Sequence, residues 1–196
     1  MREHFTAIAE ATDRQILIYN IPYRTSVNLD NETLLRLAEL PNIVGVKDSS
    51  GSIAQSLDLL ATRPAGFSVL TGEDALFFPL LCNGADGGIL ASAHVATDRF
   101  VTIAQHVAAN DHLSARAIWQ TLQQFIPKLF QEANPMPIKH CLWRQGLIAS
   151  PECRLPLTSV SVELGGVLDR LLGDVAASGG THAIQQGTTD RVRGWG

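Results

Sequence analysis

Lysine is scarce in this chain, and neither charge nor apolar residues are concentrated in any one segment. Three lysines, Lys47, Lys128 and Lys139, stand against twelve arginines, and the net charge is -4. The basic residues are scattered, which argues against a nucleic-acid surface and a polybasic membrane anchor. No segment reaches the roughly 18 apolar residues of a spanning helix, and the charged start is followed by no signal-peptide core. We therefore expect a cytoplasmic protein that binds neither nucleic acid nor a membrane.

Cysteine and histidine are sparse and dispersed. Cys82, Cys141 and Cys153 lie far apart without a CxxC pair, so the sequence indicates neither a zinc site nor a disulfide framework. We expect all three to be buried thiols. The six histidines show no HxH or HxxxH spacing, and such spacing is what a metal site on one element would need. Neither a metal nor a cofactor is predicted.

Short apolar runs alternate with helical patterns through the first 110 residues. Strands are predicted near 15–19, 43–47, 67–71 and 87–91. Helices are predicted near 2–12, 30–40, 53–62, 72–82 and 97–109, with Asp30 or Asn31 as a cap for the second. Strands separated by helices pair in parallel through right-handed crossovers. The fold class is therefore α/β, with four βα units.

The alternation stops after residue 110. One long amphipathic helix is predicted over about 111–131, followed by a break at 134–137 and by helices near 138–146 and 160–173. These limits divide the chain into a partial barrel at 1–110, a helical region at 111–175 and a tail at 176–196. The tail is rich in Gly, Thr and Gln, so we expect it to be disordered.

Two reactive side chains close successive predicted strands. Lys47 ends the run 43–47, and Tyr19 ends the run 15–19. The carboxyl ends of parallel strands open onto one face, where ligands bind. A lysine in such a pocket loses hydration, which favours its neutral, nucleophilic form and suits it for Schiff-base formation. The alternatives are a solvated loop lysine and a core tyrosine with a satisfied hydroxyl.

Four short motifs carry a resemblance to a known family. They are Tyr-Asn-Ile-Pro at 19–22, Gly-Val-Lys-Asp at 45–48, Leu-Thr-Gly-Glu-Asp at 70–74 and Gly-Gly-Ile at 87–89. In this order and spacing, over about residues 2–160, the chain resembles the dihydrodipicolinate synthase family, pyruvate-dependent class I aldolases that include N-acetylneuraminate lyase. The family fold is the TIM (β/α)8 barrel, and the resemblance covers its C-terminal half with the C-terminal helices.

The resemblance implies a role for five residues. Lys47 would form the Schiff base with pyruvate, and Tyr19 would relay protons. Arg24 would receive the carboxylate of aspartate semialdehyde, for which a guanidinium offers a bidentate fork. Gly72 and Ile89 would line the pocket mainly through backbone groups. The alternatives are a solvated loop arginine at Arg24, and ordinary turn and strand packing at Gly72 and Ile89.

The chain also departs from the family pattern. A closed barrel needs eight βα units and typically about 250 residues, and four units are found here. The family's glycine-rich turn, its Thr-Thr pair and a further tyrosine belong to the first half of the barrel, and the four units found here contain none of them. We expect a homo-oligomeric lyase of lysine and diaminopimelate biosynthesis, incomplete as this chain. A lyase for 2-keto-3-deoxy sugar acids or N-acetylneuraminate and a non-catalytic truncated fragment remain the alternatives.

Overall fold

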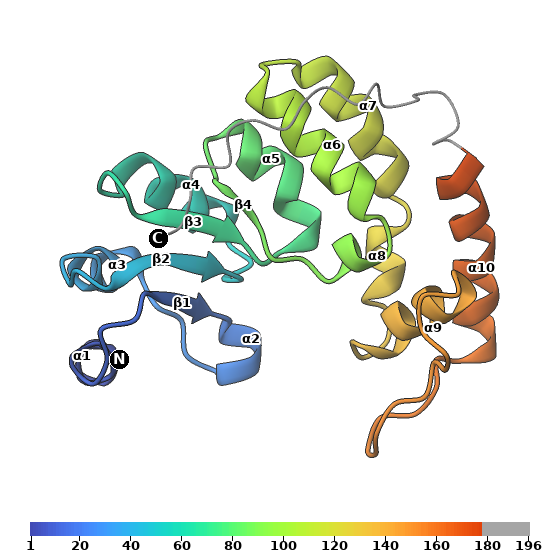
Figure 1. The fold of residues 1–196 in the computed structure, drawn as a ribbon, viewed down its shortest axis with the longest axis horizontal. Coiled ribbons are helices and arrows are strands. Elements are labelled where there is room, and N and C mark those ends of the chain that lie inside the picture. Colours follow the sequence, from blue (N-terminus) through green and yellow to red (C-terminus); the bar gives the residue numbers. More distant parts are fainter. Residues whose placement is uncertain (178–196) are drawn as a thin grey trace.

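The computed structural model describes residues 1–177, and four parallel strands form its sheet (Figure 1). The strands follow one another in chain order, β1-β2-β3-β4. Their bounds are β1 Ile16–Asn20, β2 Ile43–Asp48, β3 Ser68–Thr71 and β4 Gly87–Gly88. Neighbouring strands in chain order are joined by helical segments, as the alternating pattern predicts. The α/β class is therefore confirmed.

Helices account for most of the remaining chain. Those that accompany the sheet are α1 Arg2–Glu10, α2 Pro22–Thr25, α3 Asn31–Leu37, α4 Ile53–Thr62, η1 Asp74–Leu76, α5 Phe77–Cys82, η2 Ser92–His94 and α6 Thr97–Ala108. Those that follow are α7 His112–Leu122, α8 Ile126–Leu129, α9 Met136–Arg144 and α10 Val162–Ala177. The predicted cap of the second helix is confirmed, because the Asp30 carboxylate accepts a hydrogen bond from Thr33 N at 2.7 Å.

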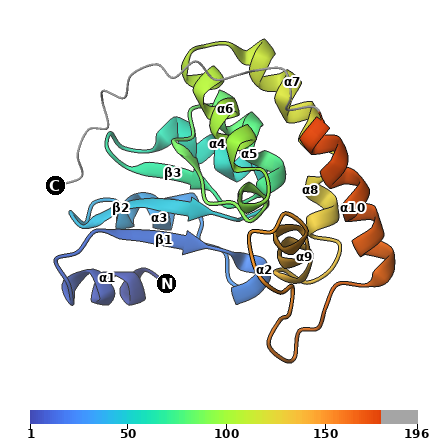
Figure 2. The same ribbon diagram turned by 45° about the vertical axis from the view of Figure 1, so that its right-hand side comes forward.

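One face of the sheet is covered and the other is open. Side chains from α1, α3 and α4 pack on the covered face around Ile18, Val46 and Val69, each at most 1% exposed. Figure 2 shows α1 and α3 beside the strands. On the opposite face Leu17 and Tyr19 remain 37% and 44% exposed. The strands therefore present one buried and one accessible row of side chains, since successive residues alternate between faces.

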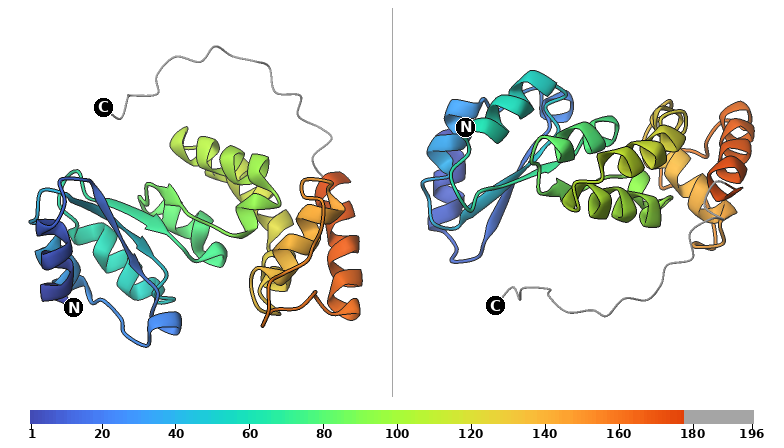
Figure 3. Two further views of the ribbon diagram at one scale, coloured as in Figure 1. Left: turned by 60° about the horizontal axis from the view of Figure 1, so that its bottom comes forward. Right: turned by 90° about the horizontal axis from the view of Figure 1, so that it is seen from above.

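Two further cores lie beyond the sheet. The first joins α5, α6 and α7 around Phe100, Ile103 and Leu122. The second joins α8, α9 and α10 around Phe125, Ile138 and Leu168. Seen from above, the sheet, the α5–α7 group and the α8–α10 group follow one another along the molecule (Figure 3).

The structure corrects three expectations. The predicted helix over 111–131 is two helices, α7 and α8, and Pro127 lies in the first turn of the second. Proline suits a helix start because it has no amide hydrogen to donate. The fourth strand is limited to Gly87–Gly88, whereas 87–91 was expected. Cys82 is exposed rather than buried, and Cys153 is only partly buried; Cys141 is buried.

Two further expectations concern membrane-spanning helices and the C-terminal tail. No helix within residues 1–177 is both long and apolar enough to cross a membrane. The predicted disordered tail lies almost entirely outside the described residues.

Candidate active site at the carboxyl ends of the strands

The carboxyl ends of the strands point toward α2 and α8 (Figure 1). In β1 and β2, Tyr19 is the register partner of Lys47, and Asn20 is the partner of Asp48. Tyr19 and Lys47 therefore share the open face, while Asn20 and Asp48 turn to the covered face, where they are 1% and 2% exposed. The strand register alone brings the two predicted reactive residues together.

The amine of Lys47 lies over the phenol ring of Tyr19. Lys47 Nζ is 3.9 Å from the ring centroid, which is within the range of a cation–π contact. Lys47 is half-buried rather than buried, because the face on which it lies is open. The amine is thus held by the ring and accessible to a ligand from the same side.

Asn20 fixes the loop that carries Arg24. Its side chain accepts a hydrogen bond from Leu29 N at 3.0 Å and donates to Asn28 Oδ1 at 2.9 Å. These bonds hold the two ends of the segment that contains α2 close together. The Arg24 guanidinium projects from α2 with its carbon 5.6 Å from the centroid of the Tyr23 ring. Arg24 is therefore an exposed cation on an anchored loop.

Gly72 follows β3 directly and lies beside the end of β2. A Cβ at this position would overlap Ser49 Oγ and would lie 2.8 Å from Lys47 Cε. Gly72 N also donates to Asp48 O at 2.7 Å. A side chain at this position would therefore have to displace Ser49 Oγ and the Lys47 side chain, and glycine leaves that space to them.

Gly72→Ala should lower the free energy of unfolding by about 1–3 kcal/mol, because the added methyl group overpacks this point. Gly173→Ala is the matched control, since nothing lies within 4 Å of a Cβ at that position of α10. The control should stabilise the chain by up to about 1 kcal/mol through helix propensity. Urea unfolding followed by circular dichroism measures both. Equal stability of Gly72→Ala and wild type would mean that Ser49 and Lys47 move aside without cost.

Glu73 is a half-buried carboxylate beside the reactive pair. Burial raises its pKa, the negative charges of Asp74 and Asp48 raise it further, and the charge of Lys47 opposes the shift. Its Oε1 atom is buried and has no hydrogen-bond partner within the described residues. Asp74, in contrast, accepts hydrogen bonds from Ser92 N and Ser92 Oγ.

A cavity of about 630 Å³ adjoins this group. Its walls are Tyr23 and Arg24 of α2, residues 72–75 after β3, and residues in the range 126–134 from α8 onward. The volume is that of a small-molecule site, for which clefts of roughly 300–1,000 Å³ are typical. Gly72 connects the cavity with Lys47, because it lines the one and adjoins the other.

The predicted residues fall into two groups around Gly72. Arg24 and Gly72 line the cavity, whereas Lys47 and Tyr19 lie beside it on the open sheet face. Ile89 lies just past β4, where its N donates to Thr71 O at 2.9 Å and its side chain is 46% exposed. This bond places the Ile89 backbone next to the peptide that joins Thr71 to Gly72.

Sequence reasoning did not assign several residues of the site. Tyr23 lines the cavity, and its pKa is raised by burial and then by the nearby Glu73 and Tyr19. Glu73 follows Gly72 directly in the motif at 70–74, and this position could have indicated that it belongs to the site. Ser49 is two residues after Lys47 and hence on the same face. Glu132 and Asn134 reach the cavity from a distant segment, for which no local signal exists.

Within residues 1–177, no three His, Cys, Asp or Glu side chains are grouped so as to hold a metal ion. The chemistry that the site offers comes from an amine, a phenol, a guanidinium and a carboxylate.

The chain is similar to a known protein family over most of its length. The model of the dihydrodipicolinate synthetase family matches residues 1–173. A 4-hydroxy-tetrahydrodipicolinate synthase 2 from Clostridium acetobutylicum is 50% identical over 170 residues, which are 87% of this chain and 59% of that protein. A 4-hydroxy-tetrahydrodipicolinate synthase from Listeria welshimeri is 41% identical over 169 residues, 86% of this chain and 57% of that protein. The chain thus spans less than two thirds of the length of these relatives.

Solved structures give the same result for the fold. A dihydrodipicolinate synthase from Thermotoga maritima matches with a TM-score of 0.86 and 33% identity, over 89% of this chain and 60% of the other. A chloride-inhibited dihydrodipicolinate synthase from Acinetobacter baumannii, complexed with pyruvate, matches with a TM-score of 0.85 and 35% identity over the same shares. The four βα units therefore form part of a (β/α)8 barrel, and the helices after them follow it as C-terminal helices.

Proposed function

The chain belongs to the dihydrodipicolinate synthetase family, and from this premise we propose that Lys47 is the nucleophile of a pyruvate-dependent class I aldolase. The reaction is that of a 4-hydroxy-tetrahydrodipicolinate synthase, which joins pyruvate to aspartate semialdehyde in lysine and diaminopimelate biosynthesis. The observation that carries the proposal is the register of Tyr19 with Lys47, with Nζ 3.9 Å from the phenol ring. Reductive trapping of pyruvate on Lys47 tests it.

The chemistry follows from an amine and a phenol on one face. The neutral amine of Lys47 adds to the ketone carbon of pyruvate, and loss of water gives an imine. The protonated imine withdraws electrons, so a methyl proton can leave and an enamine forms. The enamine carbon then attacks the aldehyde of the second substrate. Tyr19 is proposed to carry protons in these steps, and the contact of its ring with the amine supports this role.

Arg24 and the cavity beside it are proposed to bind the second substrate. The guanidinium is exposed on an anchored loop and lines the cavity of about 630 Å³. A carboxylate on the aldehyde would pair with this fork in bidentate geometry. Aspartate semialdehyde carries such a carboxylate. A lyase for 2-keto-3-deoxy sugar acids or N-acetylneuraminate is the alternative, and it would accept a sugar aldehyde in the same cavity.

Arg24→Ala should weaken the binding of aspartate semialdehyde by about 10-fold to 100-fold, since a hydrogen bond to a charged group contributes about 1.5–3 kcal/mol. The measurement is calorimetric titration of the chain whose pyruvate imine has been reduced, so that no condensation follows. Pyruvate trapping itself should be unchanged, because Lys47 lies outside the cavity wall that holds Arg24.

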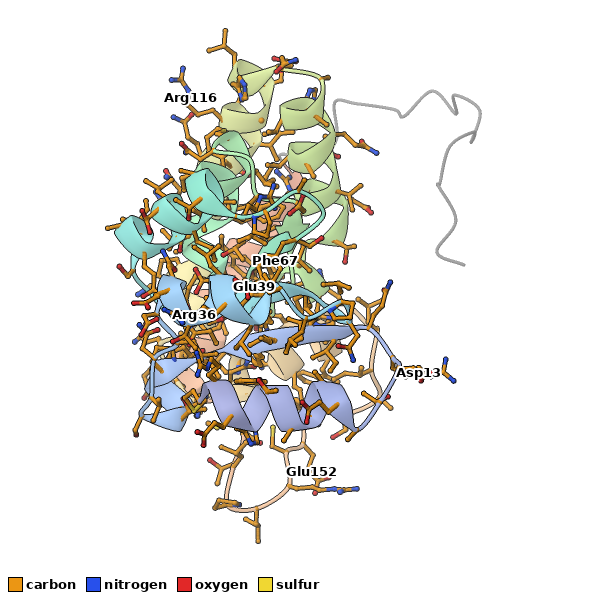
Figure 4. All side chains as sticks on the ribbon, turned by 90° about the vertical axis from the view of Figure 1, so that its left-hand side faces the viewer. Asp13, Arg36, Glu39, Phe67, Arg116 and Glu152 are labelled. Carbon is orange, nitrogen blue, oxygen red and sulfur yellow. The ribbon has the colours of Figure 1, made fainter. Side chains whose placement is uncertain are left out.

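Arg116→Ala is the matched control, because Figure 4 shows Arg116 at the periphery of the molecule on α7. It should leave both measurements unchanged. If Arg24→Ala reduced pyruvate trapping and aldehyde binding equally, Arg24 would be a structural residue of the loop. Tighter binding of a sugar aldehyde than of aspartate semialdehyde would favour the lyase alternative.

The proposed partners are small-molecule substrates and further copies of the chain. The open sheet face supports association, because Leu17, Tyr19 and Ile89 expose 37%, 44% and 46% of their surface there. Among the described residues, β1 and β4 each pair with one neighbouring strand only. Such edges and faces are normally covered in native assemblies.

A further inference from the structure

Two orphaned polar atoms flank Gly72 beside the reactive amine. Within residues 1–177, three buried side-chain oxygen or nitrogen atoms lack a hydrogen-bond partner: Asn31 Oδ1, Ser49 Oγ and Glu73 Oε1. Two of the three adjoin Gly72. Buried polar atoms are almost always bonded, so an exception needs an explanation in each case. The pairing of two exceptions with a reactive lysine indicates that these atoms are kept for a ligand.

Ser49 is the more informative of the two. It is 0% exposed, and its backbone N donates to Asn20 O at 2.8 Å, so its position is fixed. Its hydroxyl and the Cε atom of Lys47 converge on the same point, the place of a Cβ at Gly72. The hydroxyl therefore lies near the end of the lysine side chain, on the side away from solvent.

Ser56 of α4 is a second buried serine nearby, and its hydroxyl, unlike that of Ser49, is hydrogen-bonded within the protein. Ser56 is 2% exposed, and its Oγ donates to Asp48 Oδ2 at 2.6 Å. The other carboxylate oxygen of Asp48 accepts a bond from Ser50 N at 2.9 Å. The carboxylate of Asp48 on the covered face of β2 is thus hydrogen-bonded within the protein, whereas the hydroxyl of Ser49 on the open face is not.

We propose that the Ser49 hydroxyl is a catalytic donor for the adduct on Lys47, which rests on the Schiff-base function proposed above. When the amine adds to the ketone, the C–N bond forms and the carbonyl π electrons move to oxygen. Ser49 donates its hydrogen to that oxygen, and the amine nitrogen gives up a proton that restores the hydroxyl. The C–O bond then breaks as the remaining proton on nitrogen passes through the Ser49 hydroxyl to the departing oxygen, so that water leaves and the neutral imine remains.

The test compares the rate of reductive trapping in the wild-type chain, Ser49→Ala and Ser56→Ala. Pyruvate and cyanoborohydride are added, and intact mass is followed over time. Ser49→Ala should form the adduct about 10-fold to 100-fold more slowly, because a donor to a developing oxyanion is lost. Ser56→Ala should form it at the wild-type rate, since its hydroxyl faces Asp48 on the other side of the strand.

Urea unfolding without pyruvate separates this role from a structural one. Ser49→Ala should keep or raise the unfolding midpoint, because the hydroxyl that it removes makes no bond in the protein. Ser56→Ala should lower the midpoint, because the buried carboxylate of Asp48 loses a hydrogen-bond donor. A structural serine at position 49 would instead behave like Ser56.

The two proposals fail in different ways. If the wild-type chain forms no adduct, the Schiff-base function falls and the role of Ser49 falls with it. If wild type and Ser49→Ala form the adduct at equal rates, the role of Ser49 alone is overturned. A lowered urea midpoint for Ser49→Ala would also overturn it, because the hydroxyl would then be a bonded structural group.

Discussion

Pyruvate and borohydride together should add one reduced adduct to the wild-type chain, and Lys47→Ala should abolish that adduct. Lys47 is the lysine that shares the open face with Tyr19, and the structure gives its amine no hydrogen-bond acceptor among the described residues. The other two amines are engaged, because Lys128 Nζ donates to Gln131 Oε1 at 3.1 Å and Lys139 Nζ donates to Glu152 O. A free neutral amine is what imine formation requires.

Peptide mapping by mass spectrometry should place the adduct on Lys47. Lys128→Ala serves as the control, and it should keep the adduct because the Lys128 amine is bonded to Gln131 and does not lie over Tyr19. An adduct that persists in Lys47→Ala would refute the assignment of the nucleophile. The absence of an adduct in the wild-type chain would favour the non-catalytic alternative.

Tyr19→Phe should keep the adduct on Lys47 and slow the exchange of pyruvate methyl protons with deuterium by about 100-fold to 10,000-fold, the usual contribution of positioned proton transfer. The variant keeps the ring, so the contact of Lys47 Nζ with it at 3.9 Å is retained. It removes the hydroxyl, which is the group proposed to move the proton between imine and enamine. Proton NMR of pyruvate in deuterium oxide measures the exchange directly and needs no second substrate.

Tyr23→Phe is a matched control for this experiment. Tyr23 lies on α2 and lines the cavity rather than the open sheet face, and it is 66% exposed. It should leave methyl exchange close to the wild-type rate. A wild-type rate in Tyr19→Phe, or a loss of exchange in Tyr23→Phe, would move the proton relay from Tyr19 to another group.

The walls of the cavity carry charged groups of both signs. Arg24 supplies a cation on one wall of the cavity, and Glu73 and Asp74 supply carboxyl groups on another. Burial raises the pKa of both carboxyl groups, and Asp74 is held by Ser92 while Glu73 keeps a free oxygen. A ligand that brings a carboxylate to Arg24 and a hydrogen-bond donor to Glu73 would satisfy both.

The positions of Tyr19 and Lys47 could be predicted from the sequence because they depend on the pattern of apolar residues just before each of them. An apolar run that ends in Lys47 and an earlier one that ends in Tyr19 predict two strands, and parallel strands bring their carboxyl ends to one edge. Strand alternation then decides which residues share a face. The register of Tyr19 with Lys47 is the outcome of these two rules. The Asp30 cap was predicted for the same reason, because a cap acts within three residues.

Elements whose limits depend on distant packing were not predictable in this way. The helical pattern runs from 111 to 131, yet the chain breaks between α7 and α8. Leu122 packs in the core with α6, whereas Phe125 and Leu129 pack with α9 and α10. A single straight helix does not serve both cores. Similarly, β4 ends at Gly88, and Ser92 further along is held by Asp74, a partner 18 residues away.

By itself, the sequence determined the α/β class, the order of the four strands, and the position of Tyr19 and Lys47 near the carboxyl ends of the first two. The tertiary structure alone decided which polar atoms lack partners. The sequence gives no signal that the Ser49 hydroxyl or the Glu73 Oε1 atom is unpaired, because their burial results from the packing of distant segments near Gly72. The physical reason is the distance along the chain over which each effect acts. Propensity, capping and alternation act over a few residues, whereas burial and hydrogen-bond satisfaction depend on every segment that packs nearby.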